Sequence, residues 1–130
     1  MKILTALIPI IALSSCAAMR LPEQPTAPEQ FHGEWNSALA DCGTGNNDSL
    51  IVITARRIGF YESAGDIRRA VLNGRHDVLI VADISDAEET STTAFKFTLS
   101  DDGRSLTYID ETDEPFVRYR CPASRTLSPG

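Results

Sequence analysis

Short apolar runs, each followed by turn-forming residues, succeed one another along most of the chain. Within the runs large apolar side chains alternate with polar ones, as where Lys96 separates Phe95 from Phe97. A period of two residues is typical of a strand with one buried face. The runs lie at residues 31–35, 50–53, 58–61, 67–72, 76–84, 95–99, 106–109 and 116–121.

The links between the runs are short and have the composition of hairpin turns, with Asn73-Gly74 as the strongest hairpin signal. No window has a sustained helical period, and residues 38–42 have room for one helical turn. We therefore predict an all-β domain over residues 31–122, a small antiparallel up-and-down meander of about eight strands. It closes into a barrel or half-barrel, with a sandwich as the alternative. Residues 123–130 are predicted to form a flexible C-terminal tail.

Alternation also predicts which side chains face the barrel interior. A slip of one residue in any strand would turn its side chains to the other face, so each position is a separate prediction. The predicted inward-facing residues are Trp35, Leu50, Val52, Ile58, Phe60, Val71, Val78, Ile80, Phe95, Phe97, Leu99, Leu106, Val117 and Tyr119.

An apolar run, Ile3–Leu13, begins the chain behind a single charge, Lys2. The run is shorter than the roughly 20 residues of a membrane-spanning helix, so it predicts a removable signal peptide over residues 1–15. It ends in the sequence Leu-Ser-Ser-Cys, which resembles the lipobox of bacterial lipoproteins. The resemblance implies cleavage before Cys16, acylation of that cysteine and a permanent membrane anchor. The alternative is a secreted protein cut a few residues later.

Residues 16–30 are predicted to be the lipidated cysteine and a Pro-rich tether. Pro22, Pro25 and Pro28 have a spacing of three, which favours an extended polyproline conformation of roughly 40 Å. The alternative is a ligand for a proline-binding groove. Because Ala17 rather than Asp follows the lipobox cysteine, the resemblance implies the outer membrane of a bacterial envelope, facing the periplasm.

Cys42 and Cys121 remain once Cys16 is assigned to the lipid. An even pair of cysteines in a chain exported to an oxidising compartment predicts a disulfide. It would join the loop after the first strand to the last strand. The alternative, a pair of reactive thiols, lacks a C-x-x-C spacing.

Gly33-Glu34-Trp35 resembles the G-x-W opening of lipocalin-type barrels. In those barrels the tryptophan closes the base and packs against an arginine of the last strand. The resemblance therefore implies closure by Trp35 with Arg118 or Arg120 through a cation–π contact. Biotin-binding barrels begin similarly, but their site requires several tryptophans and this chain has 1.

The chain carries 12 basic and 18 acidic side chains, for a net charge of −6. Nucleic acid is excluded as a partner because its binding needs a basic face. Two acidic loops are expected, which keep sheet edges soluble or attract a basic protein partner. Their residues are Asp83, Asp86, Glu88 and Glu89 in the first loop, and Asp110, Glu111, Asp113 and Glu114 in the second.

Catalytic and metal-binding patterns have little support. His32 and His76 are far apart in sequence and are interpreted as surface histidines, and there is no G-x-S-x-G nucleophile motif. A polar loop over residues 41–48 offers oxygen ligands but lacks the spacing of a calcium-binding loop. We therefore predict no enzyme activity, no catalytic or metal-binding residue and no cofactor.

Three segments, F-H-G-E-W-N, I-G-F-Y-E-S and V-R-Y-R-C-P, resemble small envelope lipoproteins of Gram-negative alphaproteobacteria. The resemblance covers residues 31–122 and implies no particular activity. We predict a non-catalytic envelope lipoprotein that binds a partner or inhibits an enzyme. The alternative is a small-molecule carrier that uses a lipocalin-like barrel mouth and needs an internal cavity.

Overall fold

The computed structural model describes residues 21–109, 112 and 114–126, which contain strands and short 3-10 helices but no α-helix. The strands are β1 (Glu23–Gln24), β2 (Gly33–Asn36), β3 (Ile51–Ile53), β4 (Arg57–Phe60), β5 (Ala64–Asn73), β6 (Asp77–Ser85), β7 (Thr90–Leu99), β8 (Ser105–Ile109) and β9 (Pro115–Arg120). The 3-10 helices are η1 (Glu29–Phe31), η2 (Leu39–Asp41) and η3 (Ala123–Arg125).

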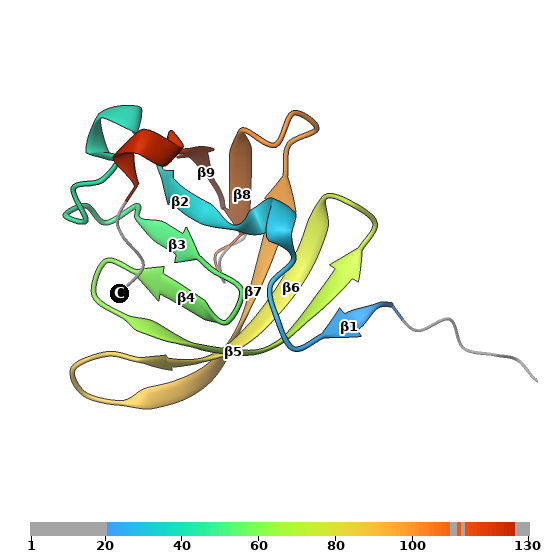
Figure 1. Cartoon of the computed structure of the whole chain (residues 1–130). Helices are drawn as coiled ribbons and strands as arrows, with labels where there is room; N and C mark the ends of the chain where they lie inside the picture. Colours follow the sequence, from blue (N-terminus) through green and yellow to red (C-terminus); the bar gives the residue numbers. More distant parts are fainter. Residues whose placement is uncertain (1–20, 110–111, 113, 127–130) are drawn as a thin grey trace, which may run out of the picture.

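Strands β2 to β9 form a closed antiparallel barrel (Figure 1). Each strand pairs with the next along the chain, and β9 pairs with β2 to close the barrel. The short strand β1 is an addition that pairs with residues 70–71 of β5. The predicted all-β up-and-down barrel is therefore confirmed, and the single turn predicted near residue 40 is η2.

The two ends of the barrel are distinguished by their connections. The turns at residues 54–56, 74–76 and 100–104 lie at one end together with η1. We call this the plugged end, because residues 27–32 cover it. The connections at residues 37–50, 61–63 and 86–89 lie at the opposite end, the loop end, because neighbouring strands alternate in direction. In Figure 1 β1 lies on the right near the plugged end, and the β6–β7 turn projects at the lower left.

Two positions in the β5–β6 hairpin require glycine, one for a tight turn and one for the close approach of the two strands. Gly74, with a φ of 71°, forms the predicted Asn73-Gly74 turn between β5 and β6. A Cβ on Gly65 would lie 1.7 Å from the carbonyl oxygen of Asp83, so only glycine permits this close approach of the two strands.

Packed side chains fill the barrel interior. Trp35, Phe97 and Ile80 are each 0% exposed. The ring centroids of Phe60 and Phe95 lie 5.0 Å apart, within the range of favourable aromatic pairs. Inward positions are confirmed by burial for Trp35, Ile58, Val78, Ile80, Phe95, Phe97, Leu99 and Leu106, while Phe60 is half-buried. Leu50 is buried but lies outside the core cluster.

In β3 and β5 the predicted register was wrong by one residue. The buried positions are Ile51, Ile53 and Ala70, in place of Val52 and Val71. Both strands have apolar residues at consecutive positions, so alternation alone could not distinguish the two faces.

The prediction for β9 was also wrong, for a different reason. Val117 and Tyr119 are exposed at 44% and 47%, whereas Arg118 and Arg120 point inward. The two arginines occupy this face because their guanidinium groups lie over aromatic rings of the interior.

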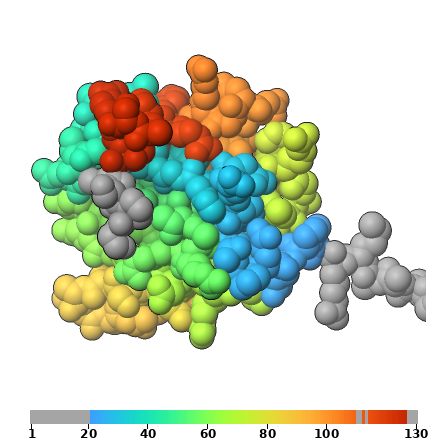
Figure 2. All heavy atoms as spheres, viewed as in Figure 1, coloured from blue at the N-terminus to red at the C-terminus, as the bar shows by residue number. Residues whose placement is uncertain are grey.

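The segment before Phe31 packs against the barrel, so the prediction of a free tether as far as Gln30 was wrong. Pro22 accepts a backbone hydrogen bond from Leu72, and Ala27 donates one to Ala55 at 2.8 Å. Phe31 and Ala27 both lie in the core. Figure 2 shows the blue and cyan spheres of this segment against the green spheres of β3 and β4. Tertiary contacts therefore override the local polyproline preference, and the folded domain includes residues 22–30.

Candidate functional site

Trp35 and Arg120 close the plugged end of the barrel. They are paired across β2 and β9, and the Arg120 Cζ atom lies 4.2 Å from the indole ring centroid. The guanidinium group donates hydrogen bonds to the carbonyl oxygens of Gln30, His32 and Gly103. The predicted contact between Trp35 and an arginine of the last strand is confirmed for Arg120.

This contact also holds the plug, residues 27–32, in place. The indole Nε1 of Trp35 donates to the carbonyl oxygen of Phe31 at 3.1 Å. Burial lowers the pKa of Arg120 below the usual arginine value, because a desolvated cation is disfavoured. Arginine nevertheless stays protonated at neutral pH, so the plug is fixed by a permanent charge.

Arg118 has a different environment, toward the loop end. Its Nε donates to the carbonyl oxygen of Ser49 at 2.6 Å. Its Cζ lies 6.0 Å from the ring centroid of Tyr108 and 5.7 Å from that of Phe116. Burial lowers its pKa, and its Nη1 is buried without a hydrogen-bond partner in the described structure. Of the two arginines predicted to close the barrel with Trp35, Arg120 therefore has that role and Arg118 does not.

The predicted disulfide between Cys42 and Cys121 is confirmed, with the two Cα atoms 5.6 Å apart. It joins the long β2–β3 loop to the end of β9 across a sequence separation of 79 residues. The C-terminal segment covers the same loop, since a Cβ on Gly43 would lie 2.7 Å from the carbonyl oxygen of Arg125.

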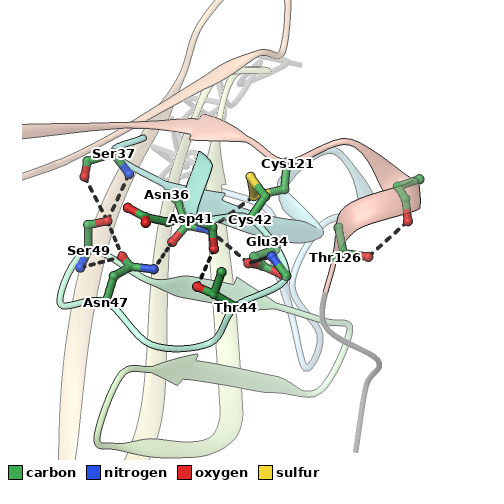
Figure 3. The surroundings of a disulfide bond; sticks show 12 residues. Glu34, Asn36, Ser37, Asp41, Cys42, Thr44, Asn47, Ser49, Cys121 and Thr126 are labelled. Atoms are coloured by element: carbon green, nitrogen blue, oxygen red, sulfur yellow. Dashed lines mark hydrogen bonds between the residues drawn. A yellow bond between two sulfur atoms is a disulfide. The ribbon is translucent and has the colours of Figure 1, made fainter. Parts of the chain in front are cut away.

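A buried polar cluster lies beside the disulfide (Figure 3). Asn36 Nδ2 lies 2.9 Å from Glu34 Oε1 and 3.2 Å from Cys121 Sγ, and donates to both. The backbone N–H of Gly43 donates to the same Glu34 oxygen at 2.9 Å. Asn47 Nδ2 donates to Asn36 Oδ1 at 2.8 Å. These bonds attach the β2–β3 loop to the outer face of β2.

Sequence reasoning did not identify this cluster. Glu34 and Asn36 flank the inward Trp35, so alternation places them on the outer face of the barrel, where solvent would be expected. They are 1% and 0% exposed because the loop folds back over them. The signal available in the sequence was the length of the loop together with the cysteine at its centre.

A hollow of about 600 Å³ at the plugged end contains a histidine and a carboxylate. His76 Nε2 lies 3.5 Å from Asp101 Oδ1, and Arg75 and Ser100 also line the hollow. The Asp101 side chain is 101% exposed and that of His76 is 43% exposed. Water therefore surrounds this pair, whereas acid–base catalysis benefits from a shielded and preorganised site. His32 lies apart and donates from Nε2 to the Ala27 carbonyl at 2.8 Å.

The first predicted acidic loop is an exposed hairpin end. Asp86 accepts backbone hydrogen bonds from Glu88 and Glu89, which lower the pKa of its carboxyl group. Asp83 is engaged by Arg68 at 3.0 Å. Of the second loop, Asp110, Glu111 and Asp113 lie outside the described residues, as does the lipobox cysteine.

The polar loop considered for calcium has structural contacts instead. Asn47 Oδ1 accepts hydrogen bonds from the backbone N–H and hydroxyl of Ser49. The described residues contain no group of three or more His, Cys, Asp or Glu side chains that could hold a metal.

Large apolar side chains gather on the last two strands. On the outer face Ile109, Val117 and Tyr119 are 41% to 47% exposed, and we call them the β8–β9 strip. A hollow of about 500 Å³ lies beside Tyr119 and is also lined by Leu39. Exposed apolar groups on neighbouring strands are a feature of protein-binding surfaces.

Comparison with protein-family models, with curated proteins and with solved structures found no match. The fold itself defines the class: a closed eight-stranded antiparallel β-barrel with one added strand and one disulfide. None of the described residues belongs to a helix long and apolar enough to span a membrane.

Proposed function

We propose that this chain is a non-catalytic lipoprotein of the bacterial envelope, anchored through Cys16, whose barrel binds a protein partner. The signal peptide is proposed to cover residues 1–15. The anchor is supported by the lipobox-like sequence, and export is supported by the disulfide, since disulfides persist in oxidising compartments.

The observation that carries the binding role is the β8–β9 strip. It exposes Ile109, Val117 and Tyr119 on the outer face while the barrel interior is filled. Aromatic and aliphatic side chains of this kind supply most of the energy at protein interfaces. Loss of their hydration on binding would favour association.

The charge of the loop end favours a basic partner. Glu62, Asp86, Glu88, Glu89 and Glu114 are exposed at or next to the connections there. An acidic rim attracts a basic protein over a distance comparable to the Debye length, about 8 Å at physiological salt. The proposed partner is therefore a protein with an apolar contact region bordered by basic residues.

A small-molecule carrier has weaker support. Such a protein needs an interior cavity, but Trp35, Phe97 and the aliphatic side chains around them fill the barrel. Catalysis by His76 and Asp101 is disfavoured by the exposure of both side chains.

The test is photo-crosslinking in the native envelope. A photoreactive residue at Tyr119 is expected to give a defined crosslinked protein, and one at exposed Arg69, on a different strand, is the control. Val117→Asp should abolish the Tyr119 crosslink without changing the melting temperature. The same adduct from both positions, or an adduct that survives Val117→Asp, would contradict the proposal. A small molecule retained in native mass spectrometry would favour the carrier.

A further inference from the structure

The structured chain enters the barrel at its plugged end. β1 is antiparallel to β5, with Glu23 opposite Val71 and Gln24 opposite Ala70. Because β5 runs toward the plugged end, Leu21 and Pro22, which precede Glu23, lie nearer to that end. Leu21 accordingly lines a surface hollow together with Asn73, the last residue of β5.

The chain between the proposed anchor and this entry point is short. A fully extended chain spans at most about 3.6 Å per residue, so Cys16 and Leu21 are at most about 18 Å apart. The binding of residues 22–31 to the barrel removes most of the predicted tether. A lipid on Cys16 would thus hold the plugged end close to the bilayer surface.

The charges of the two ends of the barrel also favour placing the plugged end toward the bilayer. Exposed arginines lie at or next to the turns of the plugged end, and Glu29, Asp101, Asp102 and Asp66, which pairs with Arg57 at 3.0 Å, make its overall charge mixed. The arginines are Arg56, Arg57, Arg75 and Arg104. At the loop end, the charged side chains of the turn at residues 86–89 are all acidic, and so is the exposed Glu62. Anionic lipid headgroups attract arginine and repel carboxylates, which disfavours contact of the loop end with the bilayer.

We propose that the barrel stands on an anionic lipid surface with its plugged end facing the headgroups and its acidic loop end pointing away. The inference rests on the proposed anchor at Cys16 and adds the orientation of the domain. Chain entry, reach and charge all favour this arrangement. It leaves the loop end accessible to a basic protein partner.

The experiment uses the full-length protein extracted with its anchor and placed in vesicles of phosphatidylglycerol and phosphatidylethanolamine. With Cys16 acylated and the other two cysteines joined, an introduced cysteine is the single free thiol for a fluorophore. Asn73→Cys labels the plugged end, and Ala87→Cys is the matched label at the loop end. Both positions are neutral, exposed and next to hairpin turns. Quenching by nitroxide-labelled lipid headgroups is then measured at each position.

We expect at least about threefold stronger quenching at Asn73→Cys, because β6 separates the two positions by about 30 Å. Insertion of a Gly/Ser segment after Ala17 should weaken that quenching, because a longer linker lets the barrel move farther from the bilayer. Equal quenching at both positions, or stronger quenching at Ala87→Cys, would overturn the orientation while leaving the anchor intact. A purified protein whose mass lacks acyl chains would overturn the anchor and, with it, the orientation.

Discussion

The Cζ atom of Arg120 lies 4.2 Å from the centroid of the Trp35 indole ring, and the same guanidinium group donates hydrogen bonds to two backbone carbonyls of the plug, those of Gln30 and His32. One side chain thus joins the last strand, the first barrel strand and the N-terminal segment. The pair closes the barrel where β2 and β9 meet, which is the step that no local hairpin can complete.

Replacement of Arg120 should therefore destabilise the whole barrel. We expect Arg120→Lys to lower the free energy of unfolding by about 2 kcal/mol or more. The compact ammonium group of lysine lacks the planar guanidinium that stacks on the indole ring while it donates to three separate carbonyls. Chemical denaturation measures this loss, and Arg75→Lys at an exposed turn is the control. Equal stability of both variants would show that the carbonyl contacts contribute little.

The disulfide should stabilise the domain strongly. Closing a loop of this length in the unfolded chain is worth about 4 kcal/mol in the chain-entropy model. We expect the double variant Cys42→Ser/Cys121→Ser, and the reduced protein, to melt at a substantially lower temperature. Calorimetry with and without reductant measures the change. The double variant should not respond to reductant, and an unchanged melt of the native chain would argue against this role.

The buried cluster beside the disulfide should be sensitive to the loss of a single amide. Asn36→Ala removes the amide that donates to Glu34 and accepts from Asn47, at a cost of about 1–3 kcal/mol. The exposed Asn46→Ala is the matched control. Amide hydrogen exchange of the β2–β3 loop should rise in the first variant and not in the second. Comparable exchange in both would mean that the disulfide alone holds the loop.

The turn between β7 and β8 should respond to acid. Asp102 accepts hydrogen bonds from the Ser100 hydroxyl at 2.7 Å and the Arg104 N–H at 3.0 Å, which lower its pKa. The stabilisation by this carboxylate is present above the ordinary aspartate pKa and lost as pH falls through the lowered value. Carboxyl NMR titration should show a low midpoint that Ser100→Ala raises. A midpoint unaffected by Ser100→Ala would contradict this assignment.

The proposed anchor depends on one thiol. We expect Cys16→Ser to leave the chain unprocessed or soluble, because the acyl acceptor is missing. Metabolic labelling with palmitate and fractionation of the envelope measure the outcome, with Ser15→Ala as a conservative control that keeps a small residue before the cysteine. A Cys16→Ser chain that is still cleaved and acylated would contradict the lipobox assignment.

Much of the fold followed from local pattern. Strand β7, in which Phe95, Phe97 and Leu99 alternate with polar residues, was predicted with the correct face, because only one register buries all three. The disulfide followed from counting, and the Trp35 contact followed from a three-residue motif.

Other features depended on contacts between distant segments. Residues 22–30 have the composition of an extended linker, but their backbone pairs with β5 and their apolar side chains enter the core. Glu34 and Asn36 are buried only because a loop returns over them. Arg118 and Arg120 point inward because aromatic rings from other strands meet them there.

The sequence by itself therefore determined the strand order, the hairpin connections and the pair of cysteines, because these depend on neighbouring residues and on composition. Only the tertiary structure decided the faces of β3, β5 and β9, the plug and the buried polar cluster. Each of these is set by the free energy of burying or pairing groups that lie far apart along the chain.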